Sequence, residues 1–166
     1  INELITRHEP AVLVIEDYDK GVLTERTIAD ILELAQRHAI PVTVDPKHRN
    51  FLRYKGVALF KPNVKELREG LKVDVNGADL DSVRNAVQHL ERTLGNTATM
   101  VTLSEHGVYA HANTTEHHIA AHSRRIVDVS GAGDTVIAVA TLALAQDLAL
   151  DHIAALANLA GGLVCE

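Results

Sequence analysis

Cysteine, basic runs and long hydrophobic runs are largely missing from this sequence. Cys165 is the only cysteine among 166 residues, so no intramolecular disulfide can form and a reducing compartment is expected. No basic stripe is present apart from the pair Arg124 and Arg125, and the formal net charge is −6. A nucleic-acid-binding surface is therefore not expected.

Signals for membranes and for secretion are also missing. The apolar stretches are too short or too interrupted to cross a bilayer. Residues 1–10 lack the charged start and apolar middle of a signal peptide. We therefore expect a cytoplasmic protein that binds no membrane. No repeat, linker or low-complexity segment divides the chain, so residues 1–166 are expected to form one domain.

Short apolar runs alternate with segments of helical spacing. Four runs predict strands buried in a sheet, at residues 12–15, 42–44, 57–60 and 100–103. Helices are expected to begin near Thr24, Asn63 and Asp81, and two more to end near 145 and at 166. Residues 108–111 and 118–121 flank the polar turn 113–116 and predict a hairpin. Strands that alternate with helices indicate an α/β fold with a mostly parallel sheet.

The predicted strands end in segments that are rich in lysine, carboxylate and small polar residues. In open α/β sheets, ligands bind in the crevice outside the carboxyl ends of the strands. Lysines mixed with carboxylates at these ends favour a site for phosphate and metal. The segments concerned are 16–21, 45–47, 61–63, 104–107 and 128–134.

Residues 130–135 (SGAGDT) lie between a predicted strand and an apolar helix. Gly131 and Gly133 permit a tight turn and let a phosphate approach bare backbone. Free amides at the start of the next helix would stabilise an anionic phosphoryl group. Asp134 could accept the proton of an attacking hydroxyl. On these residues alone, a plain turn with an acidic residue at a helix N-terminus explains the segment equally well.

Two other glycine-rich motifs fit this segment less well. A P-loop requires a lysine after its second glycine, where this chain has Asp134. A dinucleotide fingerprint requires a third glycine where Val136 stands, and a strand about 20 residues further on. A helix is expected there instead. A dinucleotide-dependent oxidoreductase is therefore the weaker alternative.

Residues 128–134 (DVSGAGD) resemble the D-x-x-G-A-G-D signature of the ribokinase-like (PfkB) carbohydrate kinases. Three further elements resemble the bacterial heptose-7-phosphate kinase branch in the same order: 17–23 (DYDKGVL), 44–47 (VDPK) and 61–66 (KPNVKE). The resemblance implies a ribokinase-like three-layer fold with a mostly parallel central sheet. It also implies an ATP-dependent kinase that phosphorylates the anomeric hydroxyl of a heptose 7-phosphate, on the route to ADP-heptose for lipopolysaccharide.

The resemblance assigns roles to particular residues. Asp134 is implied to be the catalytic base, with the amides of Gly131, Ala132 and Gly133 as the anion hole. Two residues match the N-x-x-E element that helps to hold Mg²⁺–ATP, namely Asn63 and Glu66. The same pair also predicts a plain helix cap.

Further matches concern the nucleotide. Ser104 and Gly107 match the turn that lies against the nucleotide, and Asn158 resembles an asparagine near the adenine, although it could be an ordinary helix residue. Lys47 is a candidate phosphate contact, with an ordinary surface lysine as the alternative.

A monovalent-cation site, for K⁺, is implied at Asp128 and the carbonyl of Ser130. The histidines of the hairpin do not show a recognised metal-ligand spacing, so solvated side chains are expected at His111, His117, His118 and His122.

Members of the family are much longer than this chain. The resemblance therefore predicts a kinase domain truncated at both ends, without most sugar contacts, and a full-length homodimer that binds ATP and a phosphorylated sugar. Two hypotheses remain open: a part of an active kinase that is inactive alone, or a non-catalytic nucleotide-binding remnant. An adenylyltransferase domain follows in some relatives. Truncation would leave an exposed apolar edge at residues 12–15 and favour self-association.

Overall fold

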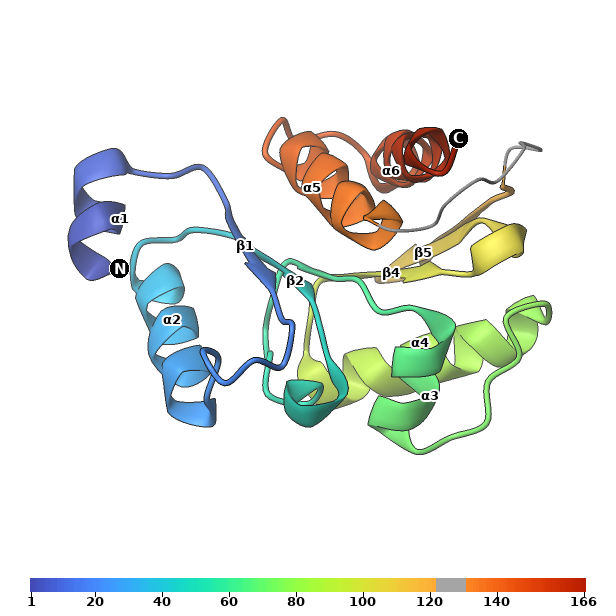
Figure 1. The fold of residues 1–166 in the computed structure, drawn as a ribbon, viewed down its shortest axis with the longest axis horizontal. Helices are drawn as coiled ribbons and strands as arrows, with labels where there is room; N and C mark the ends of the chain where they lie inside the picture. Colours follow the sequence, from blue (N-terminus) through green and yellow to red (C-terminus); the bar gives the residue numbers. More distant parts are fainter. Residues whose placement is uncertain (122–130) are drawn as a thin grey trace.

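A computed structural model describes residues 1–121 and 131–166 (Figure 1). Within these ranges, six strands form one sheet in the order β1-β2-β3-β4-β5-β6. They are β1 (Leu13–Glu16), β2 (Val42–Asp45), β3 (Leu59–Phe60), β4 (Ala98–Thr102), β5 (Val108–Ala112) and β6 (Thr115–Ile119). The strands from β1 to β4 pair in parallel, whereas β4, β5 and β6 pair antiparallel. The mostly parallel α/β sheet that the sequence predicts is therefore confirmed.

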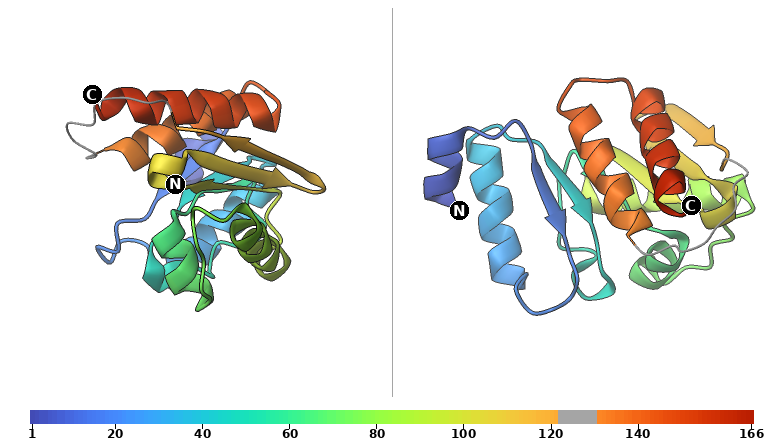
Figure 2. Two further views of the ribbon diagram at one scale, coloured as in Figure 1. Left: turned by 90° about the vertical axis from the view of Figure 1, so that its right-hand side faces the viewer. Right: turned by 45° about the horizontal axis from the view of Figure 1, so that its top comes forward.

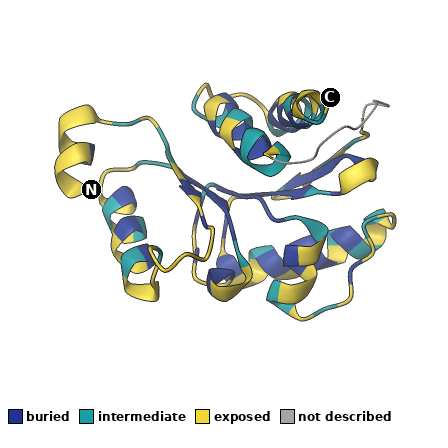
Figure 3. Ribbon diagram, in the orientation of Figure 1, coloured by how far each residue is buried: buried dark blue, intermediate teal, exposed yellow. Residues whose placement is uncertain are grey.

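Helices cover both faces of the sheet (Figure 1). On one face lie α2 (Glu25–Arg37), α3 (Val64–Leu71) and α4 (Leu80–Leu94). On the other face α5 (Ala132–Leu144) and α6 (Leu150–Val164) pack side by side (Figure 2). A short helix that the sequence patterns did not predict, α1 (Asn2–His8), lies beyond α2 and is exposed except at Ile5 (Figure 3). The three-layer arrangement is as expected.

Alternate residues of the central strands serve two separate cores. On β4, Met100 belongs to the core under α5 and α6, whereas Val101 belongs to the core that α2, α3 and α4 cover. On β2 the hydroxyls of Thr43 and Thr141 lie 2.6 Å apart and join the sheet to α5. Both faces of these strands are therefore buried, which explains why their sequences do not alternate between buried and exposed residues.

Two strands differ from the sequence prediction, β1 in its burial and β3 in its length. In β1 only Ile15 is buried, and Val14 is 44% exposed, so the prediction of a strand buried on both faces is wrong. The reason is that β1 is the first strand in the order of the described sheet. The third strand is limited to Leu59–Phe60, although the amide of Ala58 still donates to Val42 O. An exposed apolar edge is thus present at β1, as expected.

The predicted hairpin is present with a tighter turn. Ala112 pairs with Thr115, so the loop is Asn113 and Thr114, and the second strand starts at Thr115 instead of His118. Asn113 has φ 56°, which suits a short hairpin turn. The prediction that every hairpin histidine is solvated is wrong for His111, which is buried with its Nδ1 2.8 Å from Glu91 Oε2. His122 lies outside the described residues.

None of the described helices has the length and apolar character that a membrane span would require.

Candidate functional site

The start of α5 provides an uncapped helix N-terminus. Gly131 has φ 78° in the left-handed region, which glycine adopts without strain, and Ala132 is the first helical residue. No described side chain caps this end of the helix. A Cβ at Gly133 would lie 3.5 Å from Lys61 Nζ and 3.8 Å from Asp45 Oδ2, which is ordinary contact. Packing therefore does not require a glycine at position 133. Because glycine has no side chain, the backbone here is open to the approach of a ligand.

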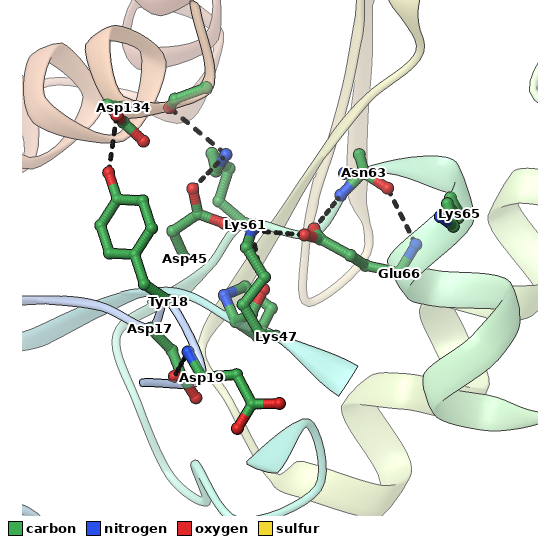
Figure 4. Close-up of polar contacts among 12 residues, drawn as sticks. Asp17, Tyr18, Asp19, Asp45, Lys47, Lys61, Asn63, Lys65, Glu66 and Asp134 are labelled. Atoms are coloured by element: carbon green, nitrogen blue, oxygen red, sulfur yellow. Dashed lines mark hydrogen bonds and ion pairs between the residues drawn. The ribbon is translucent and has the colours of Figure 1, made fainter. Parts of the chain in front are cut away.

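Asp134 lies in the first turn of α5 and meets a residue from the loop after β1. The phenol of Tyr18 donates a hydrogen bond of 2.7 Å to Asp134 Oδ2 (Figure 4). This bond, followed by desolvation, raises the pKa of Tyr18 to about 12. The phenol therefore remains a hydrogen-bond donor at neutral pH. The bond joins residues that are 116 positions apart in the sequence.

The loop that carries Tyr18 is anchored by its neighbour Asp17. The Asp17 side chain is buried, and its Oδ2 accepts from Tyr54 Oη at 2.6 Å and from Asn50 Nδ2 at 2.9 Å. Its Oδ1 accepts the amide of Asp19 at 2.8 Å. Burial and the bond to Asp17 raise the pKa of Tyr54 above its usual range. These contacts fix the backbone on either side of Tyr18.

A buried lysine joins the ends of β2 and β3 to the glycine loop. Lys61 is 2% exposed, and its Nζ lies 3.0 Å from Asp45 Oδ2 and 3.3 Å from the carbonyl oxygen of Gly133 (Figure 4). Asp45 Oδ1 is buried, and it has no hydrogen-bond partner among the described residues. A buried carboxylate oxygen with spare capacity beside this loop is suited to a cation or a water molecule held by one.

A second lysine joins Asp45 to the N-x-x-E element. Lys47 Nζ lies 2.6 Å from Glu66 Oε1 and 3.7 Å from Asp45 Oδ1. Burial alone would lower the pKa of Lys47, but the bond to Glu66 and the charge of Asp45 raise it. Lys47 is therefore a cation at the site and not an isolated surface residue.

Asn63 and Glu66 form a complete capping box on α3. Asn63 Oδ1 accepts the Glu66 amide at 2.8 Å, and Glu66 Oε2 accepts the Asn63 amide at 3.0 Å. The helix cap that the sequence predicts is thus confirmed. Glu66 Oε1 also binds Lys47 (Figure 4). Glu66 therefore belongs as well to a charged cluster, which consists of Asp45, Lys47, Lys61 and Glu66.

Carboxylates outnumber lysines where these strand ends meet. The pKa of Glu16 is raised by desolvation and by the charges of Asp134 and Asp45, with Lys61 opposing them. Such an excess of negative charge favours a bound cation. Among residues 1–121 and 131–166, no group of three or more His, Cys, Asp or Glu side chains is arranged to hold a metal ion by itself. A cation here would need ligands from water or from phosphate.

Ser104, Gly107 and Asn158 form a different group. Ser104 begins a 3₁₀ turn (Ser104–His106) that ends at Gly107, where a Cβ would lie 2.0 Å from the carbonyl oxygen of Ile119. Asn158 Nδ2 donates to Ala120 O at 2.9 Å. No hydrogen bond or ion pair of the described chain joins this group to Asp134 or Lys47. The predicted cation ligands Asp128 and Ser130 lie outside the described residues.

Tyr18, Asp45 and Lys61 were not assigned individual roles from the sequence. All three follow predicted strands and lie in the segments 17–23, 44–47 and 61–66 that resemble the kinase branch, and these two signals pointed to the segments but not to the individual residues. Their contacts with Gly133 and Asp134 depend on how α5 is placed over the sheet, and no local pattern encodes that.

Comparison with known families shows where this chain belongs. The profile of the pfkB family carbohydrate kinases matches residues 8–166. The chain belongs to the PfkB family. The resemblance found in the sequence is thereby confirmed.

Two curated relatives of this PfkB chain carry the same name. "Bifunctional protein HldE" of Caulobacter vibrioides is 42% identical over 154 residues, which are 92% of this chain and 32% of that protein. The protein of the same name from Aliarcobacter butzleri is 38% identical over 154 residues, 92% of this chain and 31% of that protein. The chain thus spans about a third of the length of these relatives.

Solved structures show the ribokinase-like fold. Escherichia coli phosphofructokinase-2 in complex with fructose-6-phosphate superposes with a TM-score of 0.85 at 22% identity, over 99% of this chain and 54% of that one. Adenosine kinase from Sinorhizobium meliloti gives a TM-score of 0.81 at 21% identity, over 99% and 51% of the two chains.

Proposed function

We propose that this PfkB chain is the nucleotide-binding and catalytic-base part of an ATP-dependent sugar kinase. One observation carries the proposal. The carboxylate of Asp134 and the uncapped start of α5 lie beside two lysines and the buried Asp45 at the carboxyl ends of β1, β2 and β3 (Figure 4). A phosphoryl acceptor needs a base, and a phosphoryl group needs amides and cations.

Phosphoryl transfer requires a general base and an anion hole, and residues 131–134 at the start of α5 supply both. Asp134 takes the proton of the sugar hydroxyl as its oxygen forms the new bond to the γ-phosphorus. The amides of Gly131, Ala132 and Gly133 stabilise the charge on the phosphoryl oxygens while the bond to the ADP oxygen breaks and its electron pair leaves with ADP. The bare backbone of Gly133 allows the close approach that this stabilisation needs.

The residues present also fit a magnesium–nucleotide complex. When bound, magnesium would supply charge neutralisation at the phosphates. Glu66 and Asp45 would hold the ion through intervening water molecules, and Lys47 would offer a cation to the phosphates. Asn63 holds Glu66 in place through the capping box. The roles of Ser104, Gly107 and Asn158 beside the nucleotide, and of Asp128 and Ser130 beside K⁺, belong to the same proposal.

The proposed acceptor is the anomeric hydroxyl of a heptose 7-phosphate. Residues 17–23, 44–47 and 61–66 resemble that branch of the family. The sequence identities also support this branch. This chain is 42% identical to HldE of Caulobacter vibrioides but 22% identical to phosphofructokinase-2. Membership in a kinase family leaves the dinucleotide-dependent oxidoreductase without support.

The test uses the full-length protein with ATP and D-glycero-D-manno-heptose 7-phosphate. Phosphorus NMR of the product should show a new phosphate on the anomeric carbon together with ADP. Transfer to another sugar would keep the kinase and reject the substrate, whereas ATP binding without transfer to any sugar phosphate would support the non-catalytic hypothesis. Residues 1–166 alone are expected to bind nucleotide without turnover.

Self-association stays a prediction for this chain. A groove of about 850 Å³ lies along β1, and its lining includes the exposed Leu4, Val14 and Tyr18. The full-length protein is proposed to be a homodimer. A monomeric 166-residue chain by light scattering would contradict the expectation that this edge is covered.

A further inference from the structure

We propose that Tyr18 is a positioning residue for Asp134, holding one carboxylate oxygen so that the other is available to the substrate hydroxyl. The inference rests on the proposed function, because it concerns the base of that reaction. Tyr18 donates to Asp134 Oδ2 at 2.7 Å, an ideal length for an O–H···O⁻ bond (Figure 4). No other hydrogen bond or ion pair within the described residues reaches this carboxylate.

The Asp134 carboxylate can rotate about its side-chain bonds. To accept a proton from the substrate hydroxyl, however, one of its oxygens must face that hydroxyl. With Oδ2 bound to Tyr18, rotation would break the bond, so the position of Oδ1 is fixed as well. Misplacement by about 1 Å can cost a hundredfold in rate. The phenol therefore acts on the geometry of the base without contacting the reacting atoms.

Tyr18 is held firmly enough for this task although its side chain is 52% exposed. The preceding residue, Asp17, is buried and accepts hydrogen bonds from Tyr54, Asn50 and the Asp19 amide. The loop therefore has a buried anchor directly beside the phenol. An exposed tyrosine on an unanchored loop would exchange its partner for water.

The charges around Asp134 explain why a neutral donor is suited to this position. Lys61 is already paired with Asp45 at 3.0 Å, and Lys47 with Glu66 at 2.6 Å. A third lysine on Asp134 would stabilise the carboxylate so strongly that it would accept a proton poorly. The phenol orients the carboxylate and adds no charge, and its raised pKa keeps its proton in place at neutral pH.

The test compares Tyr18→Phe with the unchanged full-length protein. Phenylalanine removes the hydroxyl and keeps the ring, so kcat should fall roughly tenfold to a hundredfold, the cost of one hydrogen bond to a charged group. KM for ATP and the Tm should stay unchanged. The matched control is Tyr109→Phe, which removes a phenol that donates to Glu116 at 2.6 Å on the hairpin. Its kcat should not change.

A double variant separates positioning from a general structural effect. If Tyr18 acts through Asp134, then Tyr18→Phe should cause no further loss of kcat in the Asp134→Asn background. Additive losses would overturn the inference. An unchanged or increased kcat in Tyr18→Phe would also overturn it, the increase showing that the phenol blocks the base. Full turnover in Asp134→Asn would instead overturn the proposed function itself.

Discussion

The ammonium group of Lys61 lies 3.3 Å from the carbonyl oxygen of Gly133, across 72 residues of sequence. The same nitrogen pairs with Asp45 Oδ2 at 3.0 Å, and both side chains are buried. The residue that follows β3 thus holds the glycine-containing segment 131–133 in place through a hydrogen bond to its backbone. A cation at this position also offsets the negative charge of Asp45 close to Asp134.

Replacing Lys61 should lower the free energy of unfolding. Lys61→Met removes the nearer partner of the buried Asp45 carboxylate and leaves only Lys47, 3.7 Å away, which costs up to roughly 3–5 kcal/mol of the free energy of unfolding. Urea denaturation of the variant measures that loss. Lys65→Met is the matched control, since Lys65 is exposed with Glu69 3.9 Å away, and it should cost less than about 1 kcal/mol. Equal stabilities of the two variants would show that the buried pair is unimportant.

Gly133→Ala should separate stability from activity. The residue is helical, and an added Cβ would meet Lys61 and Asp45 at 3.5 Å and 3.8 Å, which is tolerable contact. Alanine should therefore keep or raise stability, by up to about 1 kcal/mol. Turnover should fall at least tenfold, because the methyl group lies on the backbone that the phosphoryl group approaches.

Gly107→Ala provides the contrast. There φ is 89° and a Cβ would lie 2.0 Å from a backbone oxygen, so stability itself should fall. Thermal unfolding with initial rates for both variants distinguishes the two cases. Unchanged turnover in Gly133→Ala would mean that no phosphate approaches this loop.

The capping box and the charged cluster can be tested apart at Glu66. Glutamine can cap a helix as glutamate does, but it cannot pair with Lys47 as a charge. Glu66→Gln should leave stability nearly unchanged and weaken ATP binding roughly tenfold. Asp79→Ala removes the cap of α4 and should cost about 1 kcal/mol without any effect on ATP binding. ATP affinity that is unaffected in Glu66→Gln would leave Glu66 with the capping role alone.

Stability should depend on pH through Glu116. Hydrogen bonds from Arg84 and then from Tyr109 lower the pKa of this carboxyl from 4.5 to about 2. Because the folded-state pKa is depressed, the stabilisation is fully present above pH 4.5 and is lost as the pH falls toward 2. The side chain is 38% exposed, so solvent screening limits the contribution to less than about 1 kcal/mol.

Urea denaturation from pH 2 to 7 measures this dependence. The stability gap between the unchanged protein and Glu116→Gln should be constant near neutrality and should close in acid. The control Glu105→Gln, at a side chain that is 75% exposed, should show no gap. A gap that widens in acid would contradict the assigned hydrogen bonds.

Much of the fold could be predicted from local patterns, and the site only in part. Thr24 and Asn63 cap their helices as expected, and short runs rich in valine and other strand-forming residues correctly marked β2 and β4. The apolar pattern of residues 12–15 alone predicted burial on both faces, because a local pattern does not show which strand lies at the edge of the sheet. The exposed edge was expected only from the truncation that the family resemblance implies. Likewise, Asp134 was visible in its motif, but the bond from Tyr18 depends on the packing of α5 over β1 and β2.

The role of Asp134 is tested most directly by phosphoryl transfer in the full-length protein with Asp134→Asn. Asparagine keeps the size of the side chain and cannot accept the proton of the hydroxyl at neutral pH. We predict that kcat falls by at least about a hundredfold, as expected for loss of a general base, while ATP binds with unchanged affinity. Turnover that survives in Asp134→Asn would remove this carboxylate from the reaction and contradict the proposed function.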